Sequence, residues 1–391
     1  MRSFALFALL ALTSSNAFAF DVRIDRDNQT VKPGMETLPV HVGGRVADHP
    51  LASPLPSGAK AYSHEWPGIY FEANFAGDEL DLKFDDPANE YRAFIDNIAP
   101  LTLTQLGRVE VAITGLGPGP HAVRLEKVTE SALVSASFDG FFLPNGETGA
   151  APKPRIRQIE FIGDSDMTGY GIRSASRTCT ADEVRLFSDT QIAYPALVAK
   201  RLNADYQINA ISGRGLVRNF PGVIGSAMAF AYSATLPDLE PGAKQSAFES
   251  GSWAPQIFVV GLGGNDFALP LQQGEKWETN DDLIVDFLAA YVSLIAKLHE
   301  RSPDAALILQ TFDADSLSAA DQALLNDGMS FLLAEAARKA GFKSVSTISL
   351  NEMAIEKSAC AFHPSPQDHQ READWLVNFI SERPEIWGPR S

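Results

Sequence analysis

Residues 158–171 read Gln-Ile-Glu-Phe-Ile-Gly-Asp-Ser-Asp-Met-Thr-Gly-Tyr-Gly, a pattern typical of a strand that turns sharply into a helix. The apolar run at residues 159–162 has the length of a buried strand, and the Gly-Asp-Ser tripeptide at residues 163–165 predicts the turn. A helix is expected to begin near Thr168. A hydroxyl on such a turn is lifted clear of the sheet and lies close to unpaired backbone N–H groups. Ser165 is therefore a candidate nucleophile, although Gly-Asp-Ser by itself is also compatible with an ordinary loop.

The chain after this stretch alternates between predicted strands and helices. Strands are predicted at residues 159–162, 206–211, 257–261, 306–310 and 345–348, and helices at residues 193–202, 283–298, 319–340 and 367–380. Residues 220–252 show no clean periodicity and are expected to form a long surface excursion over the site. The alternation predicts an α/β fold with a parallel sheet covered by helices on both faces. Ligands of such sheets bind at the carboxyl ends of the strands.

Residues 1–19 carry the three-part pattern of a secretory signal peptide. Arg2 precedes an apolar run at residues 4–12, and a small-x-small end predicts cleavage between Ala19 and Phe20. The apolar run is too short for a membrane anchor, which needs roughly 20 continuous apolar residues. We therefore expect a secreted or periplasmic protein.

Residues 20–150 have the pattern of an all-β domain. Strands are predicted at residues 39–42, 68–75, 79–84, 91–95, 109–114, 122–128 and 134–142, with turn signals between them. This regular spacing predicts a jelly-roll-like β-sandwich, which either binds carbohydrate or only buttresses the next domain. Residues 145–154 are polar and contain Gly and Pro, so they are predicted to form a linker. The second domain is expected to span residues 151–391.

The composition excludes several classes of partner. The 391 residues are 45% hydrophobic, enough for two domain cores, and the formal net charge of −17 argues against binding to nucleic acid or an anionic membrane. No Cys-x-x-Cys or His-rich spacing predicts a metal site. The two cysteines, Cys179 and Cys360, either pair in an oxidising compartment, which we favour, or remain buried thiols. We expect a neutral ligand and no metal or organic cofactor.

Three further positions supply the chemistry that Ser165 requires. Gly213 and Asn265 each follow a predicted strand, and His363 lies just before the last predicted helix. This topology can bring all of them to the edge of the sheet that carries Ser165. A hydroxyl nucleophile needs an imidazole that takes its proton and donors aimed at the tetrahedral oxyanion. The backbone N–H groups of Ser165 and Gly213 and the side-chain amide of Asn265 are the candidate donors.

These motifs, in this order, resemble the SGNH (GDSL-type) hydrolase family. The resemblance is carried by Gly163-Asp164-Ser165, Gly213, Gly263-Gly264-Asn265-Asp266 and His363-Pro364. With its preceding sandwich, the chain is most similar to carbohydrate esterase family 2. The resemblance implies a three-layer hydrolase domain and an acetylxylan esterase-like enzyme that deacetylates polysaccharides or oligosaccharides such as xylan or glucomannan. It also implies Ser165 as the nucleophile, His363 as the general base, and Ser165, Gly213 and Asn265 as the oxyanion hole.

One position departs from the family pattern. Related hydrolases place an aspartate two or three residues before the histidine, but Cys360 and Ala361 stand there. We therefore expect a Ser–His dyad, in which a backbone carbonyl just before His363 accepts the imidazole N–H and sets the tautomer. Cys179 lies 14 residues after Ser165, so a disulfide would also hold the histidine loop in place of the missing carboxylate.

Trp253 and Asp266 are candidate substrate contacts, because aromatic faces stack on pyranose rings and Asp266 flanks the third motif. Core packing for Trp253 and turn hydrogen bonding for Asp266 are the structural alternatives. Two rival functions are a lipase or thioesterase on the same fold, and a carbohydrate-binding protein whose site has decayed, because the triad acid is absent. The polysaccharide, the sugar hydroxyl and the oligomeric state stay open.

Overall fold

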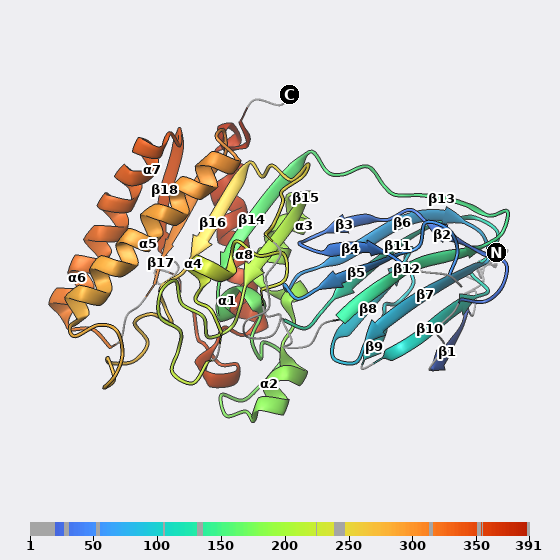
Figure 1. Cartoon of the computed structure of the whole chain (residues 1–391), viewed down its shortest axis with the longest axis horizontal. Coiled ribbons are helices and arrows are strands. Elements are labelled where there is room, and N and C mark those ends of the chain that lie inside the picture. The colour runs from blue at the N-terminus through green and yellow to red at the C-terminus, as the bar shows by residue number, and fades with distance from the viewer. Residues whose placement is uncertain are drawn as a thin grey trace, which may run out of the picture.

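The computed structural model describes residues 20–26, 31–51, 55–104, 106–130, 136–223, 225–237, 247–312, 316–349, 353 and 355–388. The predicted signal peptide at residues 1–19 lies outside the described residues. An all-β unit formed by the first part of the chain lies beside an α/β unit formed by the second (Figure 1). No helix in the described ranges combines the length and the apolar content needed to cross a membrane.

The first unit is a sandwich of two antiparallel sheets, and this confirms the predicted fold. Its strands are β1 (Asp21–Arg26), β2 (Met35–Leu38), β3 (His41–Gly43), β4 (Ala47–Pro50), β5 (Lys60–His64), β6 (Tyr70–Ala76), β7 (Glu79–Asp86), β8 (Glu90–Ile95), β9 (Leu101–Thr104), β10 (Gly107–Thr114), β11 (Pro120–Lys127), β12 (Ala136–Pro144) and β13 (Thr148–Ala150). One sheet has the order β1-β10-β7-β12-β5-β4 with β2 paired to β12. The other has the order β13-β6-β11-β8-β9 with β3 paired to β6. Inward-facing rings such as Phe71, Phe84 and Phe138 fill the space between the sheets.

The sequence pattern does not predict β1, β2, β4, β5, β9 and β13. These strands are short, and most lie at sheet edges, where polar residues replace the apolar alternation. β13 lies within residues 145–154 and pairs with β6, so the predicted linker is wrong for Thr148–Ala150. The chain crosses to the second unit only after this strand.

The second unit is a parallel sheet with helices on both faces, which confirms the predicted α/β fold. Its strands are β14 (Arg157–Gly163), β15 (Ala204–Ala210), β16 (Ile257–Gly261), β17 (Ala306–Thr311) and β18 (Ser344–Ser349), in the order β15-β14-β16-β17-β18. Its helices are α1 (Ser165–Thr168), α2 (Ala181–Phe187), α3 (Tyr194–Arg201), α4 (Met228–Ala231), α5 (Asn280–Arg301), α6 (Ala319–Asp327), α7 (Ala334–Ala340) and α8 (Pro366–Ser381). The strand order reverses between β14 and β16, and ligands of such sheets bind at the carboxyl ends beside this point.

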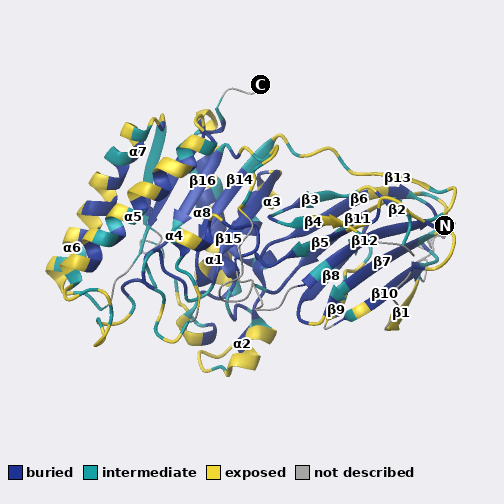
Figure 2. Cartoon of the chain, in the orientation of Figure 1, coloured by how far each residue is buried: buried dark blue, intermediate teal, exposed yellow. Residues whose placement is uncertain are grey.

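The strands β14, β15, β16 and β17 are largely buried, whereas the outer sides of α5, α6 and α7 are exposed (Figure 2). Ile159 and Phe161 pack with α3 and α8 on one face. Ile162 and Val260 belong to the cluster that contains the apolar stripe of α5 on the other face. A strand covered on both sides needs apolar residues at consecutive positions, which explains why these runs are recognisable in the sequence.

The described helices differ from the predictions at four places, and one of these, α4, lies where no helix is predicted. α1 begins at Ser165 and already ends at Thr168, because Gly169 adopts a left-handed φ of 70° and closes the turn. The helix predicted at residues 319–340 consists of α6, a π-helical segment at Gly328–Leu333, and α7. α2 is not predicted, although Thr180 begins it with a reciprocal capping box.

The predicted surface excursion at residues 220–252 is wrong for residues 228–236, while residues 224 and 238–246 lie outside the described part of the chain. Met228, Ala231 and Tyr232 are buried. The Arg45 guanidinium, which comes from the sandwich, lies 4.4 Å from the centre of the Tyr232 ring and 4.0 Å from that of Phe248. This segment therefore fills the junction between the two units, where irregular packing needs no helical or strand periodicity.

A buried ion-pair cluster joins the two units at this junction. Arg45 Nη2 donates to Glu160 Oε1 at 2.9 Å, and Arg301 Nη2 donates to Glu160 Oε2 at 2.6 Å. The side chains of Arg45 and Glu160 have no exposed area. Burial acts to raise the pKa of Glu160, but the two guanidiniums outweigh it, so the pKa lies below its ordinary value. Removing either partner of such a pair leaves an uncompensated buried charge, which is strongly destabilising.

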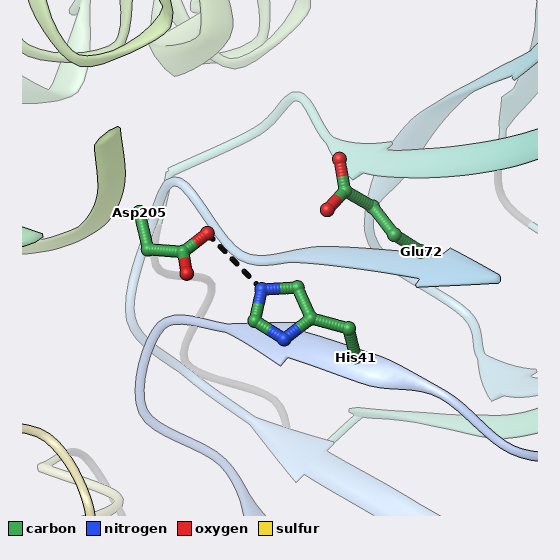
Figure 3. A group of neighbouring side chains, drawn as sticks. All are labelled: His41, Glu72 and Asp205. Atoms are coloured by element: carbon green, nitrogen blue, oxygen red, sulfur yellow. Dashed lines mark hydrogen bonds and ion pairs between the residues drawn. The ribbon is translucent and has the colours of Figure 1, made fainter. Parts of the chain in front are cut away.

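A second charged cluster lies at the amino end of β15, where His41, Glu72 and Asp205 point toward one another (Figure 3). Their ligand atoms lie within 4.8 Å of one another, close enough to hold a cation. However, Arg155 Nη1 donates to Asp205 Oδ1 at 2.7 Å and Nη2 donates to Glu72 Oε1 at 2.8 Å. Burial acts to raise the Asp205 pKa, but hydrogen bonds from His41, Tyr70 and this guanidinium outweigh it and lower the pKa to about 2. The guanidinium already balances the carboxylates, so we assign the cluster to docking of the two units.

Candidate active site

Ser165 stands at the carboxyl end of β14, where the strand turns directly into α1. Asp164 caps α1, and its carboxylate accepts the backbone N–H of Asp166 at 3.3 Å. The imidazole of His363 lies at the same edge of the sheet, with Nε2 2.8 Å from the Ser165 hydroxyl oxygen. The two residues are 198 positions apart in the chain, and the fold brings them into hydrogen-bond contact.

The loop that carries His363 is sharply bent, because Ala361 and Phe362 have left-handed φ angles of 50° and 63°. The bend turns the Cys360 carbonyl toward the imidazole, and its oxygen lies 3.0 Å from His363 Nδ1. Since a carbonyl can only accept, Nδ1 carries the hydrogen and Nε2 presents its lone pair to Ser165. In the described part of the chain, no carboxylate hydrogen-bonds to this imidazole.

The His363 ring is partly buried and packs on the Tyr170 ring, with 4.4 Å between the ring centroids. Burial lowers the pKa of His363 below its ordinary value, while the Asp166 carboxylate and the carbonyls of Cys360 and Ala361 act in the opposite direction. This lowered pKa favours the neutral imidazole, which can accept a proton.

Gly213 and Asn265 lie in the turns that follow β15 and β16. Gly213 adopts a left-handed φ of 76°, which favours glycine. Asn265 Nδ2 donates to Asp164 Oδ2 at 3.0 Å and to the Arg214 carbonyl at 3.2 Å. This amide thus ties the Gly-Asp-Ser turn to the turn that contains Gly213. The fold places the predicted nucleophile, base and oxyanion donors at one edge of the sheet, and their roles stay predictions.

Asp266 points away from this edge and is fully buried. Its carboxylate accepts the backbone N–H groups of Leu216, Val217 and Arg218 at 2.7, 2.8 and 2.9 Å. Burial raises the Asp266 pKa to about 6, although these three hydrogen bonds act to lower it. Asp266 therefore anchors the backbone after the Gly213 turn, which supports the structural alternative and not the predicted substrate contact.

Trp253 lies at the opposite end of the sheet from Ser165. It precedes β16, and its indole Nε1 donates to Glu160 Oε2 at 2.9 Å within the junction of the two units. Because the candidate site lies at the carboxyl ends of the strands, an indole at their amino ends does not reach it. The predicted role of Trp253 as a substrate contact at this site is therefore not supported.

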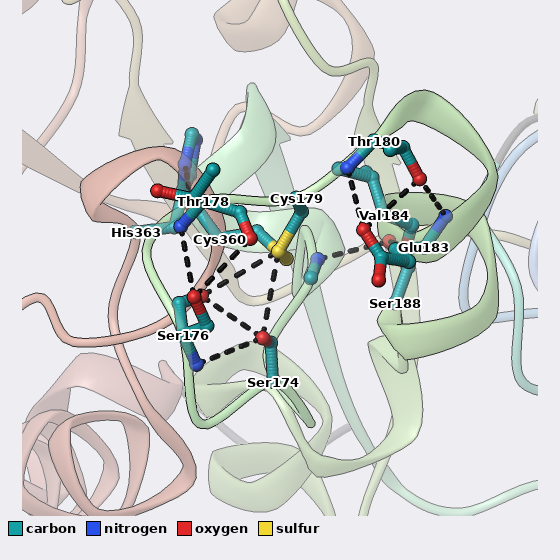
Figure 4. The surroundings of a disulfide bond; sticks show 11 residues. Ser174, Ser176, Thr178, Cys179, Thr180, Glu183, Val184, Ser188, Cys360 and His363 are labelled. Atoms are coloured by element: carbon teal, nitrogen blue, oxygen red, sulfur yellow. Dashed lines mark hydrogen bonds between the residues drawn. A yellow bond between two sulfur atoms is a disulfide. The ribbon is translucent and has the colours of Figure 1, made fainter.

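Cys179 and Cys360 form a disulfide, with 5.5 Å between their Cα atoms, and this confirms the predicted pairing (Figure 4). The bond joins the loop after Ser174 to the loop that carries His363. Backbone contacts reinforce it, because the Ala361 N–H donates to the Arg177 carbonyl at 2.7 Å. The disulfide therefore lies three residues from the candidate base and directly at the carbonyl that binds Nδ1.

One residue near the site escaped the sequence interpretation. Glu130 follows β11 in the sandwich, and its carboxylate accepts the hydroxyl of Ser212, the residue before Gly213. Glu130 belongs to no motif and lies in a different structural unit from Ser165. Only the docking of the two units shows that it is near the site.

Two protein families match the chain in the same order as the two units. Residues 56–154 match the carbohydrate esterase 2 N-terminal family. Residues 161–371 match the GDSL-like lipase/acylhydrolase family. The first range falls in the sandwich and the crossing segment, and the second in the α/β unit.

Individual relatives and solved structures agree with these matches. The chain is 37% identical over 394 residues to an acetylxylan esterase / glucomannan deacetylase of Cellvibrio japonicus, which covers 99% of this chain and 100% of the relative. It is 31% identical over 253 residues to the cellulase/esterase CelE of Acetivibrio thermocellus, with 64% of this chain and 29% of the relative covered. A carbohydrate esterase structure whose active site displays divergent catalytic and non-catalytic binding functions has a TM-score of 0.79 at 35% identity, covering 90% of this chain and 100% of that one. A family two carbohydrate esterase from Clostridium thermocellum in complex with cellohexaose has a TM-score of 0.69 at 25% identity, covering 89% and 99%.

Proposed function

Because the chain belongs to carbohydrate esterase family 2 and is a carboxylic ester hydrolase, we propose that it removes O-acetyl groups from a polysaccharide such as xylan or glucomannan. The observation that carries the proposal is the 2.8 Å contact between Ser165 Oγ and His363 Nε2 at the carboxyl end of β14. The relative named acetylxylan esterase / glucomannan deacetylase supports the choice of substrate.

In the acylation step, His363 Nε2 accepts the hydroxyl proton of Ser165 while Oγ attacks the acetyl carbonyl carbon. The carbonyl becomes an oxyanion in a tetrahedral intermediate. This intermediate collapses as the bond to the sugar oxygen breaks, and the imidazolium returns its proton to that oxygen. The products are a free sugar hydroxyl and an acetyl ester on Ser165.

In the deacylation step, a water molecule gives a proton to His363 Nε2 and its oxygen attacks the acetyl-enzyme. A second tetrahedral intermediate collapses, Ser165 Oγ leaves with the proton from the imidazolium, and acetate is released. The steps balance without a metal or an organic cofactor.

We assign the orienting role of the missing aspartate to the Cys360 carbonyl, 3.0 Å from His363 Nδ1. A carbonyl fixes the tautomer but carries only a partial charge, so it stabilises the imidazolium less than a carboxylate does. The Asp166 carboxylate opposes the lowering of the His363 pKa by burial and therefore supplies part of the missing negative charge. The disulfide at Cys360 holds the carbonyl in place.

The oxyanion is stabilised by the backbone N–H groups of Ser165 and Gly213 and by Asn265 Nδ2. The Asn265 amide already makes two hydrogen bonds, of which the bond to the Arg214 carbonyl is the longer at 3.2 Å. The developing oxyanion replaces this weaker bond, while the bond to the Asp164 carboxylate keeps the amide oriented.

The mature enzyme acts outside the cytoplasm in this proposal. Residues 1–19 are the signal peptide, with cleavage between Ala19 and Phe20, and residues 20–150 and 151–391 are the two domains. The disulfide supports this assignment, because such bonds persist mainly in oxidising compartments.

The test is acetate release from acetylated xylan and acetylated glucomannan, with an aryl acetate as the simple substrate. Wild type is expected to release acetate, and Ser165→Ala to lose at least about 10³-fold in kcat. Equal thermal unfolding midpoints of Ser165→Ala and wild type serve as the folding control.

Two results would favour a rival function. A wild-type chain that is inert toward aryl acetates and still binds polysaccharide would make the protein a carbohydrate-binding protein. A strong preference for aryl esters of long acyl chains over the acetate would point to a lipase or thioesterase.

A further inference from the structure

The sandwich sends one carboxylate to the edge of the sheet that carries Ser165. Glu130 lies three residues beyond the end of β11. The backbone leading to it is docked on the α/β unit, because the Thr190 N–H donates to the Val128 carbonyl at 2.9 Å and Gln191 Nε2 donates to the Lys127 carbonyl at 3.0 Å. The position of Glu130 is therefore set by the junction of the two units.

Glu130 binds the turn from which the proposed oxyanion donor emerges. The Ser212 hydroxyl donates to Glu130 Oε2 in a short hydrogen bond. Thr168 Oγ1 lies 2.9 Å from Ser212 Oγ and 3.1 Å from the Ser165 carbonyl oxygen. One carboxylate thus connects the turn after β15 with the last residue of α1.

The position of Ser212 gives this contact a consequence for catalysis. The peptide bond between Ser212 and Gly213 carries the N–H that is proposed to bind the oxyanion, so its orientation depends on how Ser212 is held. Hydrogen bonds of oxyanion holes act over a narrow range of distance and angle, and a shift of about 1 Å is enough to weaken catalysis strongly.

Glu130 also interacts with groups that lie next to the proposed nucleophile and base. Burial raises the Glu130 pKa, while hydrogen bonds from Ser212 and Thr168 and the charge of Lys127 act to lower it. The Tyr170 pKa is raised by burial and by the Glu130 charge, and the Tyr170 ring packs on the candidate base. The proposed nucleophile and base therefore each have a neighbour that interacts with Glu130. For Ser165 this neighbour is Thr168, and for His363 it is Tyr170.

We infer that Glu130 is a positioning residue, through which the sandwich fixes the Ser212–Gly213 turn for oxyanion binding. The inference rests on the proposed esterase function of the same site. In this inference the sandwich takes part in the reaction, unlike an appended module that only binds glycan.

The inference predicts a loss in kcat with little change in KM, because the oxyanion exists only in the tetrahedral state. Deleting one oxyanion donor costs about 10²–10³-fold, and a donor that is present but misaligned is expected to cost less, about 5- to 50-fold. Glu130→Gln retains the size of the side chain and an accepting oxygen, so it is expected to lose less than Glu130→Ala.

The experiment measures kcat and KM on an aryl acetate for Glu130→Gln, Glu130→Ala, Ser212→Ala and the Glu130→Ala/Ser212→Ala double variant. If Glu130 acts through Ser212, the double variant is no slower than the slower of the two single variants. The matched control is Glu72→Gln, which removes a junction carboxylate bound to Arg155 at the far end of β14. It is expected to lower the unfolding midpoint and to leave kcat unchanged.

Three results would overturn the inference: an unchanged kcat in Glu130→Ala, a double variant whose loss equals the product of the single losses, or an equal loss of kcat in Glu72→Gln. The last would mean that any weakening of the junction slows the enzyme. Because the substrate is an aryl acetate, these comparisons stand even if the natural ester is not a polysaccharide. A wild-type chain without activity on any acetyl ester would instead refute the proposed function.

Discussion

Removal of the disulfide in a Cys179→Ser/Cys360→Ser variant is expected to lower both stability and kcat. The bond joins residues 181 positions apart. In the chain-entropy model, closing a loop of this length stabilises the fold by up to about 5 kcal/mol. The unfolding midpoint should therefore fall by several degrees.

The effect on kcat follows from the carbonyl of Cys360, which holds Nδ1 of His363 at 3.0 Å. Without the disulfide, this carbonyl is still restrained by the Ala361 N–H, which donates to the Arg177 carbonyl at 2.7 Å. The loss should therefore stay near the value of one hydrogen bond to a charged group, about 1.5–3 kcal/mol, or roughly 10- to 150-fold in kcat.

The assay measures aryl acetate hydrolysis by wild type, reduced wild type and the double variant at a temperature where all three are folded. Thermal unfolding of the same three samples is measured separately. The double variant serves as its own control, because a reductant should change wild type and leave the variant unaffected. A variant that melts earlier but retains the wild-type kcat would refute the idea that the bond orients the base, and would leave it a purely stabilising role.

Three further outcomes are expected. Gly171→Ala places a Cβ 2.4 Å from the Cys360 Cβ at a φ of 56°, so stability should fall by about 2–3 kcal/mol together with kcat, whereas Gly222→Ala, with φ 87° and open space around it, should show only the backbone cost of about 1 kcal/mol. Asp166→Asn removes a charge that acts to raise the pKa of His363, the proposed base, so the acidic limb of the kcat/KM profile should move to lower pH; a limb that stays or moves upward would contradict this electrostatic role. Asp205→Asn should cost about 2 kcal/mol of unfolding free energy at pH 7, because the folded pKa of about 2 lies below the ordinary value of 3.8; this contribution is present above pH 3.8 and lost as the pH falls toward 2, so equal stabilities of variant and wild type at pH 7 would contradict it.

The sequence predicts the contact between Ser165 and His363 because both follow from turns at the edge of a parallel sheet. Such an edge gathers residues that are far apart in the chain, whatever the details of packing. The direction of a neighbouring side chain is not contained in this pattern. Asp266 stands next to Asn265 in the sequence, yet it turns inward because three backbone N–H groups need an acceptor there.

For two other residues, the sequence prediction and the structure differ for separate physical reasons. Trp253 precedes the strand that begins at Ile257, so its place at the amino end was accessible from the sequence. Glu130 was not accessible in this way, because its contact with Ser212 depends on how two domains dock. Local periodicity reports the elements of each domain but not the surface on which they meet.

Among the described residues, every hydrogen bond of the Arg45 guanidinium goes to the other half of the molecule: to Gln207, Glu160 and the carbonyls of Tyr232 and Ala234. A recombination event that cut the gene between the halves would leave a cation without anions in one product and a carboxylate short of one counterion in the other. Each half of the molecule therefore depends on the other to balance its buried charges, and separating the two would destabilise both products.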